Sequence, residues 1–498
     1  MSSTFSTYSI AYTGLYVNQT ALATTSSNLA NVNTAGASRV RTASVEMDTV
    51  QKSGSFTGDG VSLASITRAR ESLMDKVYRT QNSSSTYYSV KSGNLQYLDQ
   101  VLTEYEASSD ATDSESTSDS VGLQQEITDF FSAWETVSVD SSTESSRTSV
   151  ISAGTSLVEM LTSIDSQLQQ LQQESVSGVK EGVDSLNDLA SQVADLNGQI
   201  SSAEANGSEA TYLRDQRDAL LDEMSSLANI NVTQMNNTIQ VSIGSITIVD
   251  GRDSYALEVD GTGTTSDPLT VKRADIDCKV AVNSGSIAAY LEDADQSGYE
   301  DIDSASLPYD FSTDASSSIT NMRQALNVLI TTLADKINTL ATSGVDGEGE
   351  AGEAFFTVVD SSKPLSITNI KVNPNLVDDP EKLVTASSSD DGDNTIANQI
   401  LELASEECYS YGGIANDITG FYAALTSWIG TTGDEASNNY KTQEALTESV
   451  ANQRQSISGI SVDEETANMI KLQNAYAASA RVMSTVDSLL AGLIEDIG

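Results

Sequence analysis

Hydrophobic residues near the start of the chain recur at alternating intervals of three and four. The spacing predicts an amphipathic helix whose apolar seam faces another helix. The seam consists of Phe5, Tyr8, Tyr12, Leu15, Leu22 and Leu29, and it is interrupted by Gln19 and Ser26. Asn31, Asn33, Thr34 and Gly36 follow, and these residue types favour the end of a helix and a turn.

The other end of the chain has a stricter pattern. Ser461 and Glu464 have the spacing of a helix-capping box, and Asp463 to Glu465 place negative charge where the helix dipole favours it. The seam that follows has one residue every seven positions and a second set between them: Met469, Tyr476, Met483 and Leu490, with Leu472, Val486 and Leu493. A helix with such a seam requires a partner helix.

Helical spacing also dominates the middle of the chain. One seam runs from Leu157 to Leu171 and a second from Val179 to Ile200, and we expect Gly178 and Gly182 to loosen the join between them. A third helix is expected from Leu213 to Leu227. These patterns predict a rod-like helical bundle.

At Ile230 the period changes to two, which predicts short strands separated by Asn, Gly and Asp turns. A second β-like region follows Phe355. The predicted class is therefore multidomain α+β. The expected division is a terminal coiled-coil assembly domain (1–40 and 460–498), a helical bundle (41–227, 313–345 and 390–459) and a β-rich outer domain (228–312 and 346–389).

Charge narrows the possible functions. The 498 residues include 25 Lys and Arg against 71 Asp and Glu, so the formal net charge is −46. A field of this sign repels phosphate backbones and anionic lipid heads, which argues against nucleic-acid and membrane partners.

Histidine is absent, so the commonest general base and zinc ligand are missing. No apolar run approaches the roughly 18 residues that span a bilayer, and the uncharged residues 2–38 do not form a cleavable signal peptide.

Two features remain as candidate chemistry. Cys278 and Cys408 lie far apart, and free thiols are favoured, although a disulfide between them stays open. Asp293, Asp295 and the following Ser and Gly resemble the start of a calcium loop, but Ser304 stands where the bidentate Glu belongs. An acidic turn is the favoured interpretation and an ion site the alternative. We expect no metal, no cofactor and no catalytic residues.

Several segments resemble known proteins. The segment SSNLANVNTAGASR resembles the signature shared by rod, hook and hook-associated subunits of the bacterial flagellum, and it carries Asn28, Asn31, Asn33, Thr34, Gly36 and Arg39. The segments GDGVSLASITRARESLMDKVYR, YLRDQRDALLDEMSSLANINV and GEAGEAFF, together with the C-terminal helix, are similar to the family of flagellar hook-associated protein 1. Ala37 stands where that family usually has an aromatic residue.

The resemblance implies a structural axial protein that joins hook to filament through paired N- and C-terminal helices. It also implies export by the flagellar type III apparatus without signal cleavage, and a place outside the cell at the hook-filament junction. The implied partners are copies of the chain, the hook protein, a second hook-associated protein, and a cytoplasmic export chaperone on the C-terminal helix.

Three alternatives are weighed against this function. The nearest is a paralogous flagellar hook or rod protein, which would lack the YLRDQRDALL helix. A secreted carbohydrate-active enzyme with a helical stalk could work with two carboxylates, but aromatic residues make up only 6% of the chain. A calcium-binding surface protein would depend on the loop at Asp293.

Overall fold

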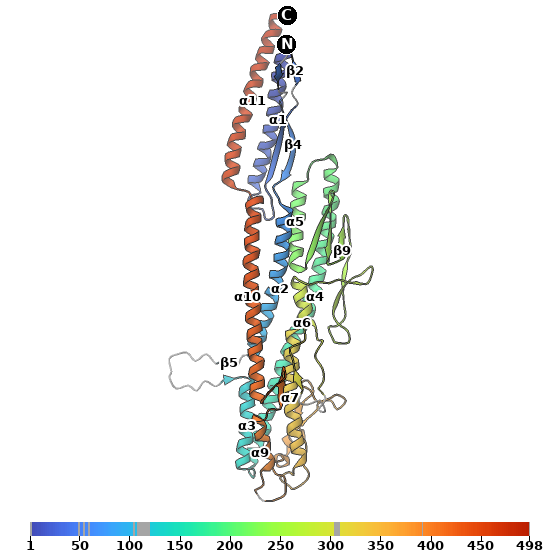
Figure 1. The fold of residues 1–498 in the computed structure, drawn as a ribbon, viewed down its shortest axis with the longest axis vertical. Helices are drawn as coiled ribbons and strands as arrows, with labels where there is room; N and C mark the ends of the chain where they lie inside the picture. Colours follow the sequence, from blue (N-terminus) through green and yellow to red (C-terminus); the bar gives the residue numbers. More distant parts are fainter. Residues whose placement is uncertain are drawn as a thin grey trace, which may run out of the picture.

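The computed structural model describes residues 2–497, apart from 48–49, 53–54, 58–59, 103–104, 107–119, 303–308 and 391. The molecule is an elongated rod with both chain ends at the same tip (Figure 1). Long helices form its length, and small sheets lie along its side and near its far end. The predicted α+β class is confirmed.

The tip is a terminal unit in which helix α1 (Ser2–Ala30) lies against helix α11 (Val462–Ile497). The antiparallel pair β1 (Val40–Glu46) and β4 (Val61–Arg68) covers another side of α1, with a bulge between Ala43 and Ser44. Two shorter strands, β2 (Val50–Lys52) and β3 (Ser55–Thr57), extend that hairpin. The structure thus places the residues from 41 to 68 with the terminal helices, whereas the sequence pattern had assigned them to the bundle.

The middle of the rod consists of helices that run along its axis. Helix α2 (Ser72–Leu102) packs along α10 (Ile418–Ser458), and α5 (Thr211–Leu227) lies beside α4 (Glu144–Ala203). The two seams predicted on either side of Gly178 and Gly182 belong to α4, which is one continuous helix of 60 residues. A Cβ on Gly178 or Gly182 would come within 3.0 Å of the side chain of Tyr290 or Ile287. These glycines therefore allow α6 (Ser286–Ala294) to approach α4 closely.

The β segment that follows α5 packs against the upper half of α4. It forms a four-stranded antiparallel sheet and then a three-stranded one: β7 (Ile230–Met235), β8 (Thr238–Ile243), β9 (Ile246–Asp250) and β10 (Asp253–Ser254), then β11 (Leu257–Asp260), β12 (Thr270–Arg273) and β13 (Cys278–Lys279). Apolar residues of α4, α5, α6 and these sheets share one core, which contains Val193, Met224, Val241 and Ile287.

The far end of the rod has a second, larger core, built around Phe130, Trp134, Phe355 and Phe356. Its helices are α3 (Leu123–Val139), the lower part of α4, α7 (Ser318–Ser343), α8 (Pro374–Asp378) and α9 (Thr395–Glu402), together with the end of α2 and the start of α10. Its strands are β14 (Asp310–Phe311), β15 (Phe356–Thr357), β16 (Lys371–Val372), β17 (Tyr409–Tyr411) and β18 (Ile414–Asn416). A further two-stranded pair, β5 (Tyr105–Glu106) and β6 (Ser120–Val121), lies at the end of α2.

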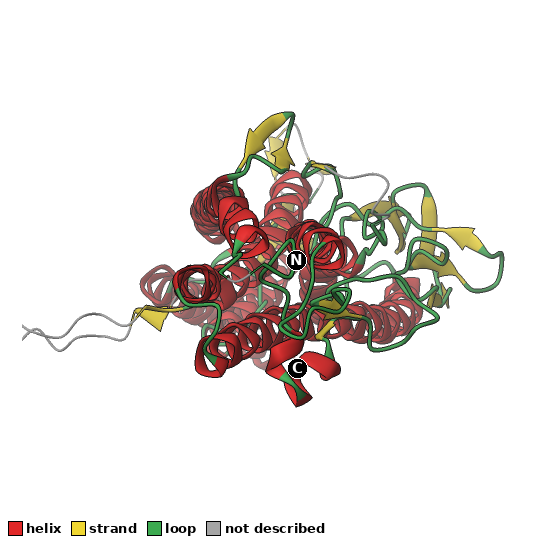
Figure 2. Ribbon diagram, turned by 90° about the horizontal axis from the view of Figure 1, so that it is seen from below, coloured by secondary structure: helices red, strands yellow, loops and turns green. Residues whose placement is uncertain are grey.

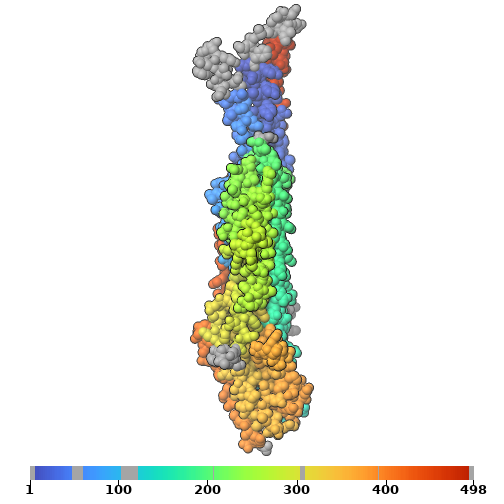
Figure 3. Space-filling view, turned by 90° about the vertical axis from the view of Figure 1, so that its right-hand side faces the viewer, coloured from blue at the N-terminus to red at the C-terminus, as the bar shows by residue number. Residues whose placement is uncertain are grey.

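The two β-like segments of the sequence therefore do not share one core. Residues 230–280 pack on the upper half of α4, whereas residues 355–384 pack among α3, α4 and α7 at the far end. Figure 3 shows them as separate green and orange regions along the rod, and Figure 2 shows the helices end-on with strands at the periphery. The alternation of strand-like and helix-like stretches predicted that these β segments exist, but not which helices each of them packs against.

Candidate assembly surface

Helix α1 faces its neighbours with small side chains. Its most shielded residues are Ala11, Val17, Ala21, Thr25 and Asn28. A Cβ on the glycine at position 14 would lie 3.4 Å from the Ser479 hydroxyl of α11, and on another side the Val61 amide donates to the Thr13 hydroxyl at 3.4 Å. Because α1 is enclosed by both α11 and the hairpin, close approach favours small residues at these positions.

The larger apolar residues predicted as the seam of α1 are less covered. Tyr8, Leu15, Leu22 and Leu29 are half-buried, and Tyr12 is 55% exposed. On α11, Val486 is buried and Tyr476 is 38% exposed, while the other predicted seam residues are half-buried: Met469, Leu472, Met483 and Leu490. The side chains of Phe5 and Leu493 lie outside the described residues.

Large apolar side chains remain on the solvent side of the two terminal helices. We call them the outer apolar residues: Ile10, Tyr12, Tyr16, Ile470, Tyr476, Val482 and Leu489, of which Leu489 is 63% exposed. Exposed apolar residues that gather in one region of a protein mark contact sites more often than residues scattered singly. Seven such residues lie on α1 and α11, so a neighbouring protein could bury additional apolar surface of these two helices.

Asn28 connects three elements at the base of the terminal unit. It is 4% exposed. Its Nδ2 donates to the Val40 carbonyl at 2.9 Å and to Glu465 Oε2 at 3.1 Å, and its Oδ1 accepts from the Val40 amide at 3.1 Å. All of these contacts need a planar amide with both a donor and an acceptor, so Asn28 fixes the end of α1 against β1 and the start of α11.

Arg39 completes this junction. Its Nε donates to Glu465 Oε1 at 2.7 Å, its Nη1 to Glu464 Oε2 at 2.7 Å, and its amide to the Ser458 carbonyl at 2.8 Å. The predicted cap at Ser461 is present, because its hydroxyl accepts from the Glu464 amide at 3.4 Å. The Glu464 carboxylate, however, binds Arg39 in place of closing the capping box.

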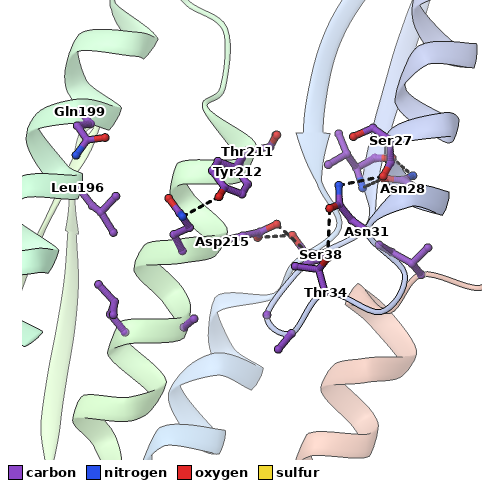
Figure 4. A pocket seen from close by; sticks show the side chains of 18 of the residues that line it. Ser27, Asn28, Asn31, Thr34, Ser38, Leu196, Gln199, Thr211, Tyr212 and Asp215 are labelled. Carbon is purple, nitrogen blue, oxygen red and sulfur yellow. Dashed lines mark hydrogen bonds between the residues drawn. The ribbon is translucent and has the colours of Figure 1, made fainter.

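The loop between Asn28 and Arg39 docks the terminal unit on α5 (Figure 4). The Thr34 hydroxyl donates to Asn31 Oδ1 at 3.3 Å, and Gly36 has a φ of +79°, which a side chain rarely adopts. The Ser38 amide and hydroxyl donate to the Asp215 carboxylate at 3.0 and 2.5 Å. Asn33 is exposed. Ser38 thus anchors the loop on α5.

A groove of about 580 Å³ lies beside the Ser38 contact and is lined by this loop, α4 and α5. Ala37 lines the groove together with Tyr212 and Leu220. A short side chain at position 37 therefore borders open space, where a larger residue would reach the helices.

An ionic network that the sequence pattern did not predict lies just below the loop. Arg68 pairs with Asp215 and Asp218 at 2.8 Å each, Arg79 pairs with Asp222 at 2.8 Å, and Arg454 of α10 pairs with Asp222 at 2.7 Å. Burial opposes ionisation of Asp218, but the guanidinium groups of Arg70, Arg68 and Arg79 outweigh it and hold its pKa below the usual range. The signal in the sequence was three arginines before and within α2, facing the acidic repeat of α5.

The other predicted candidates lie elsewhere. Cys278 and Cys408 are free thiols, and only Cys408 is in the far core. Asp293 is 5% exposed and accepts from Asn94 Nδ2 at 2.6 Å, while Asp295 accepts from the Ser297 amide and from two hydroxyls. Among the described residues no cluster of three or more acidic or thiol groups could hold a metal ion. Within the same residues no helix is long and apolar enough to cross a membrane.

Comparison with known families matches three parts of the chain. Residues 110–356 match the flagellar hook-associated protein FlgK helical domain, residues 444–495 the C-terminal region of the flagellar basal body rod FlgEFG proteins, and residues 10–37 a flagella basal body rod protein family. The match at residues 10–37 covers most of α1, and the match at residues 444–495 covers the end of α10 and most of α11.

Whole proteins match over nearly their full lengths. The chain is 26% identical to flagellar hook-associated protein 1 of Bacillus subtilis (strain 168), over 100% of this chain and 99% of that protein. It is 24% identical to the Escherichia coli (strain K12) protein of the same name, over 97% and 98%. Among solved structures, the flagellar hook junction protein FlgK from Burkholderia pseudomallei has the same fold, with a TM-score of 0.60, 16% identity, and coverage of 78% of this chain and 100% of that one.

Proposed function

Because the chain belongs to the family of flagellar hook-associated protein 1, we propose that it is a structural subunit that joins the hook of the bacterial flagellum to the filament. The rod, with a terminal unit at one end and two separate cores along its length, suits a mechanical part that polymerises through one end. The alternatives in other functional classes have no comparable support. We infer a role without catalysis, because the family is a structural one.

The observation that carries this proposal is the pairing of α1 with α11. These two helices come from opposite ends of the chain and are joined by Asn28, Arg39 and Glu465. The pair already buries part of each predicted seam, yet it leaves the outer apolar residues in solvent. In a tube of identical copies, each pair gains burial only when neighbours supply the other surface.

Membership of this family indicates which proteins the chain contacts in the flagellum. We propose that the outer apolar residues contact other copies of the chain, with the hook protein on one side of the junction and a second hook-associated protein on the other. Export through the flagellar type III apparatus, and capture of α11 by a cytoplasmic chaperone before export, are part of the same proposal. Both need a helix that is apolar on one side and available before assembly.

A pair of variants in α11 tests this proposal in cells that lack the native gene. Ile470 is 55% exposed, so Ile470→Asp leaves folding of the chain nearly unchanged. In the assembled tube it buries an unpaired carboxylate, which costs several kcal/mol for each subunit. We expect the variant to be made and exported while the cells lose attached filaments and shed filament protein. Gln473→Asp introduces the same charge at an exposed position outside the apolar set. It is the matched control and should leave swimming intact; swimming of the Ile470→Asp cells would contradict the proposal.

A further inference from the structure

A groove of about 550 Å³ opens between α2, α5 and the first strands of the upper sheet. Its lining contains six cationic side chains and three carboxylates: Arg68, Arg70, Lys76, Arg79, Arg214 and Arg217 against Asp75, Glu209 and Asp218. The whole chain has 25 basic residues against 71 acidic ones. The lining itself therefore has more cationic than acidic side chains, although Glu204, Asp215 and Asp222 pair with its arginines from just outside it.

Most of these cations already have a carboxylate partner. Arg68, Arg70, Arg79 and Arg214 all form ion pairs with acidic residues, for example Arg214 with Glu204 at 2.6 Å. Arg217 and Lys76 form none with the acidic residues that the structure describes. These two cations, one inside the groove and one exposed at its edge, are the charges of the lining that have no direct ion pair among the described residues.

Arg217 is the more unusual of the two, because it is 2% exposed. Its Nη1 donates to the neutral Asn197 Oδ1 at 2.9 Å, and its Nε has no hydrogen-bond partner among the described residues. The next residue, Asp218, binds Arg68 and Arg79. Burial lowers the pKa of Arg217 to about 10, so the side chain is still charged at neutral pH. Asp218 and Glu204 attract this charge without pairing with it directly, and an anion in direct contact would lower the cost of burying the guanidinium further.

We propose that this groove binds a small oxyanion, of the phosphate or carboxylate class, between Arg217 and Lys76. Guanidinium groups form paired hydrogen bonds to such oxyanions, and lysine adds a mobile point charge. The apolar side chains of Leu221, Val232 and Ile239 form part of the lining, and they lower the local dielectric and strengthen each charged contact. Because the groove touches α2, α5 and β4, a bound anion stabilises the part of the rod that carries the terminal unit.

The competing interpretation is that the cations only hold the helices together. In that case no added anion stabilises the chain more than salt does, and removal of Arg217 costs stability under all conditions. Under the proposal, phosphate stabilises the native chain more than chloride does, and Arg217→Gln removes that response. The two interpretations therefore differ in whether an added anion stabilises the chain and in whether Arg217 is needed for it.

Thermal unfolding of the full chain, with inorganic phosphate added at constant ionic strength set by sodium chloride, decides between them. We expect a rise in Tm of about 1 °C at ten times the dissociation constant, which continues logarithmically with phosphate concentration. Arg217→Gln should remove the rise, and Arg252→Gln, which removes an exposed arginine bound to the Ser201 hydroxyl, should keep it. Acetate in place of phosphate shows whether a carboxylate suffices.

A second measurement covers the case in which Arg217→Gln does not fold. Phosphorus NMR of phosphate should show line broadening by the native chain, and the surface variant Lys76→Gln should reduce that broadening at least twofold. No broadening by the native chain, or a rise in Tm that chloride reproduces or that Arg217→Gln retains, would overturn the proposal.

Discussion

Arg39 and Glu465 lie 426 positions apart in sequence, and their side chains meet at 2.7 Å where the two terminal helices join the rod. The Glu465 side chain is 3% exposed and that of Arg39 is 15% exposed. Asn28 donates to the other oxygen of the same carboxylate. One buried carboxylate thus holds together the end of α1, the start of β1 and the first turn of α11.

Glu465→Gln should loosen the terminal unit and leave the rod intact. The change leaves the guanidinium of Arg39 without its most buried partner, and breaking such a pair costs about 3 kcal/mol. Amide exchange should rise across α1 and α11 and stay slow in α4 and α7. Glu464 is 62% exposed, so Glu464→Gln is the control and should cost less than about 1 kcal/mol. Equal exchange in both variants would contradict this prediction.

The second prediction concerns pH. Burial raises the pKa of Asp293 to about 6, with Asn94 as the hydrogen-bond partner and Glu292 and Lys91 nearby. Since the folded chain binds this proton more tightly than the unfolded chain, the stability contributed by the neutral form is full at low pH. It is lost as pH rises from about 4 to about 6. Asp293→Asn should therefore raise the free energy of unfolding by about 2 kcal/mol at pH 7 and by little at pH 4.

Chemical denaturation at both pH values measures this difference. The control is Asp295→Asn: the Asp295 carboxylate is a partly exposed acceptor for neighbouring hydroxyl and amide groups, and the substitution should destabilise slightly at both pH values. A loss of stability in Asp293→Asn at pH 7 would refute the assignment.

The glycines of α4 provide a third prediction. Gly182→Ala places a Cβ 2.7 Å from Ile287 Cγ1, and Ile287 is fully buried. The clash should outweigh the gain in helix propensity and destabilise the chain by about 1–3 kcal/mol. Gly198→Ala, in the same helix, meets nothing closer than 3.9 Å and should stabilise by up to about 1 kcal/mol. Thermal unfolding of the two variants should shift Tm in opposite directions, and a rise in both would show that α6 does not require the glycine.

Calcium should not change the stability of the chain. The Asp295 carboxylate accepts from the Ser297 amide and from the hydroxyls of Ser297 and Ser316, and Asp293 faces Asn94. The oxygens of the Asp295 carboxylate therefore already accept hydrogen bonds from residues of the turn. Millimolar calcium and magnesium should give the same Tm, and a rise specific to calcium would restore the ion-binding alternative.

The sequence predicted the long seams of α4 well, because residues such as Leu161, Leu168 and Val183 repeat on one face and are all buried. It misplaced the inner face of α1, because that helix packs against two elements and selects small residues such as Ala11 and Ala21. Neither the Arg39–Glu465 pair nor the arginines around Asp218 follows from periodicity. Such contacts join residues more than a hundred positions apart, and spacing along the chain carries no information about them.

Contact between the outer apolar residues and neighbouring copies can be detected by site-specific cross-linking in isolated hook-filament junctions. A photoreactive benzophenone residue replaces Leu489, which is 63% exposed on α11, and in a second sample it replaces Gln167, which is exposed on α4 of the rod. Illumination of the Leu489 sample should yield adducts between two copies of the chain in high proportion. Assembled junctions that give no such adducts from Leu489, but give them from Gln167, would contradict this expectation.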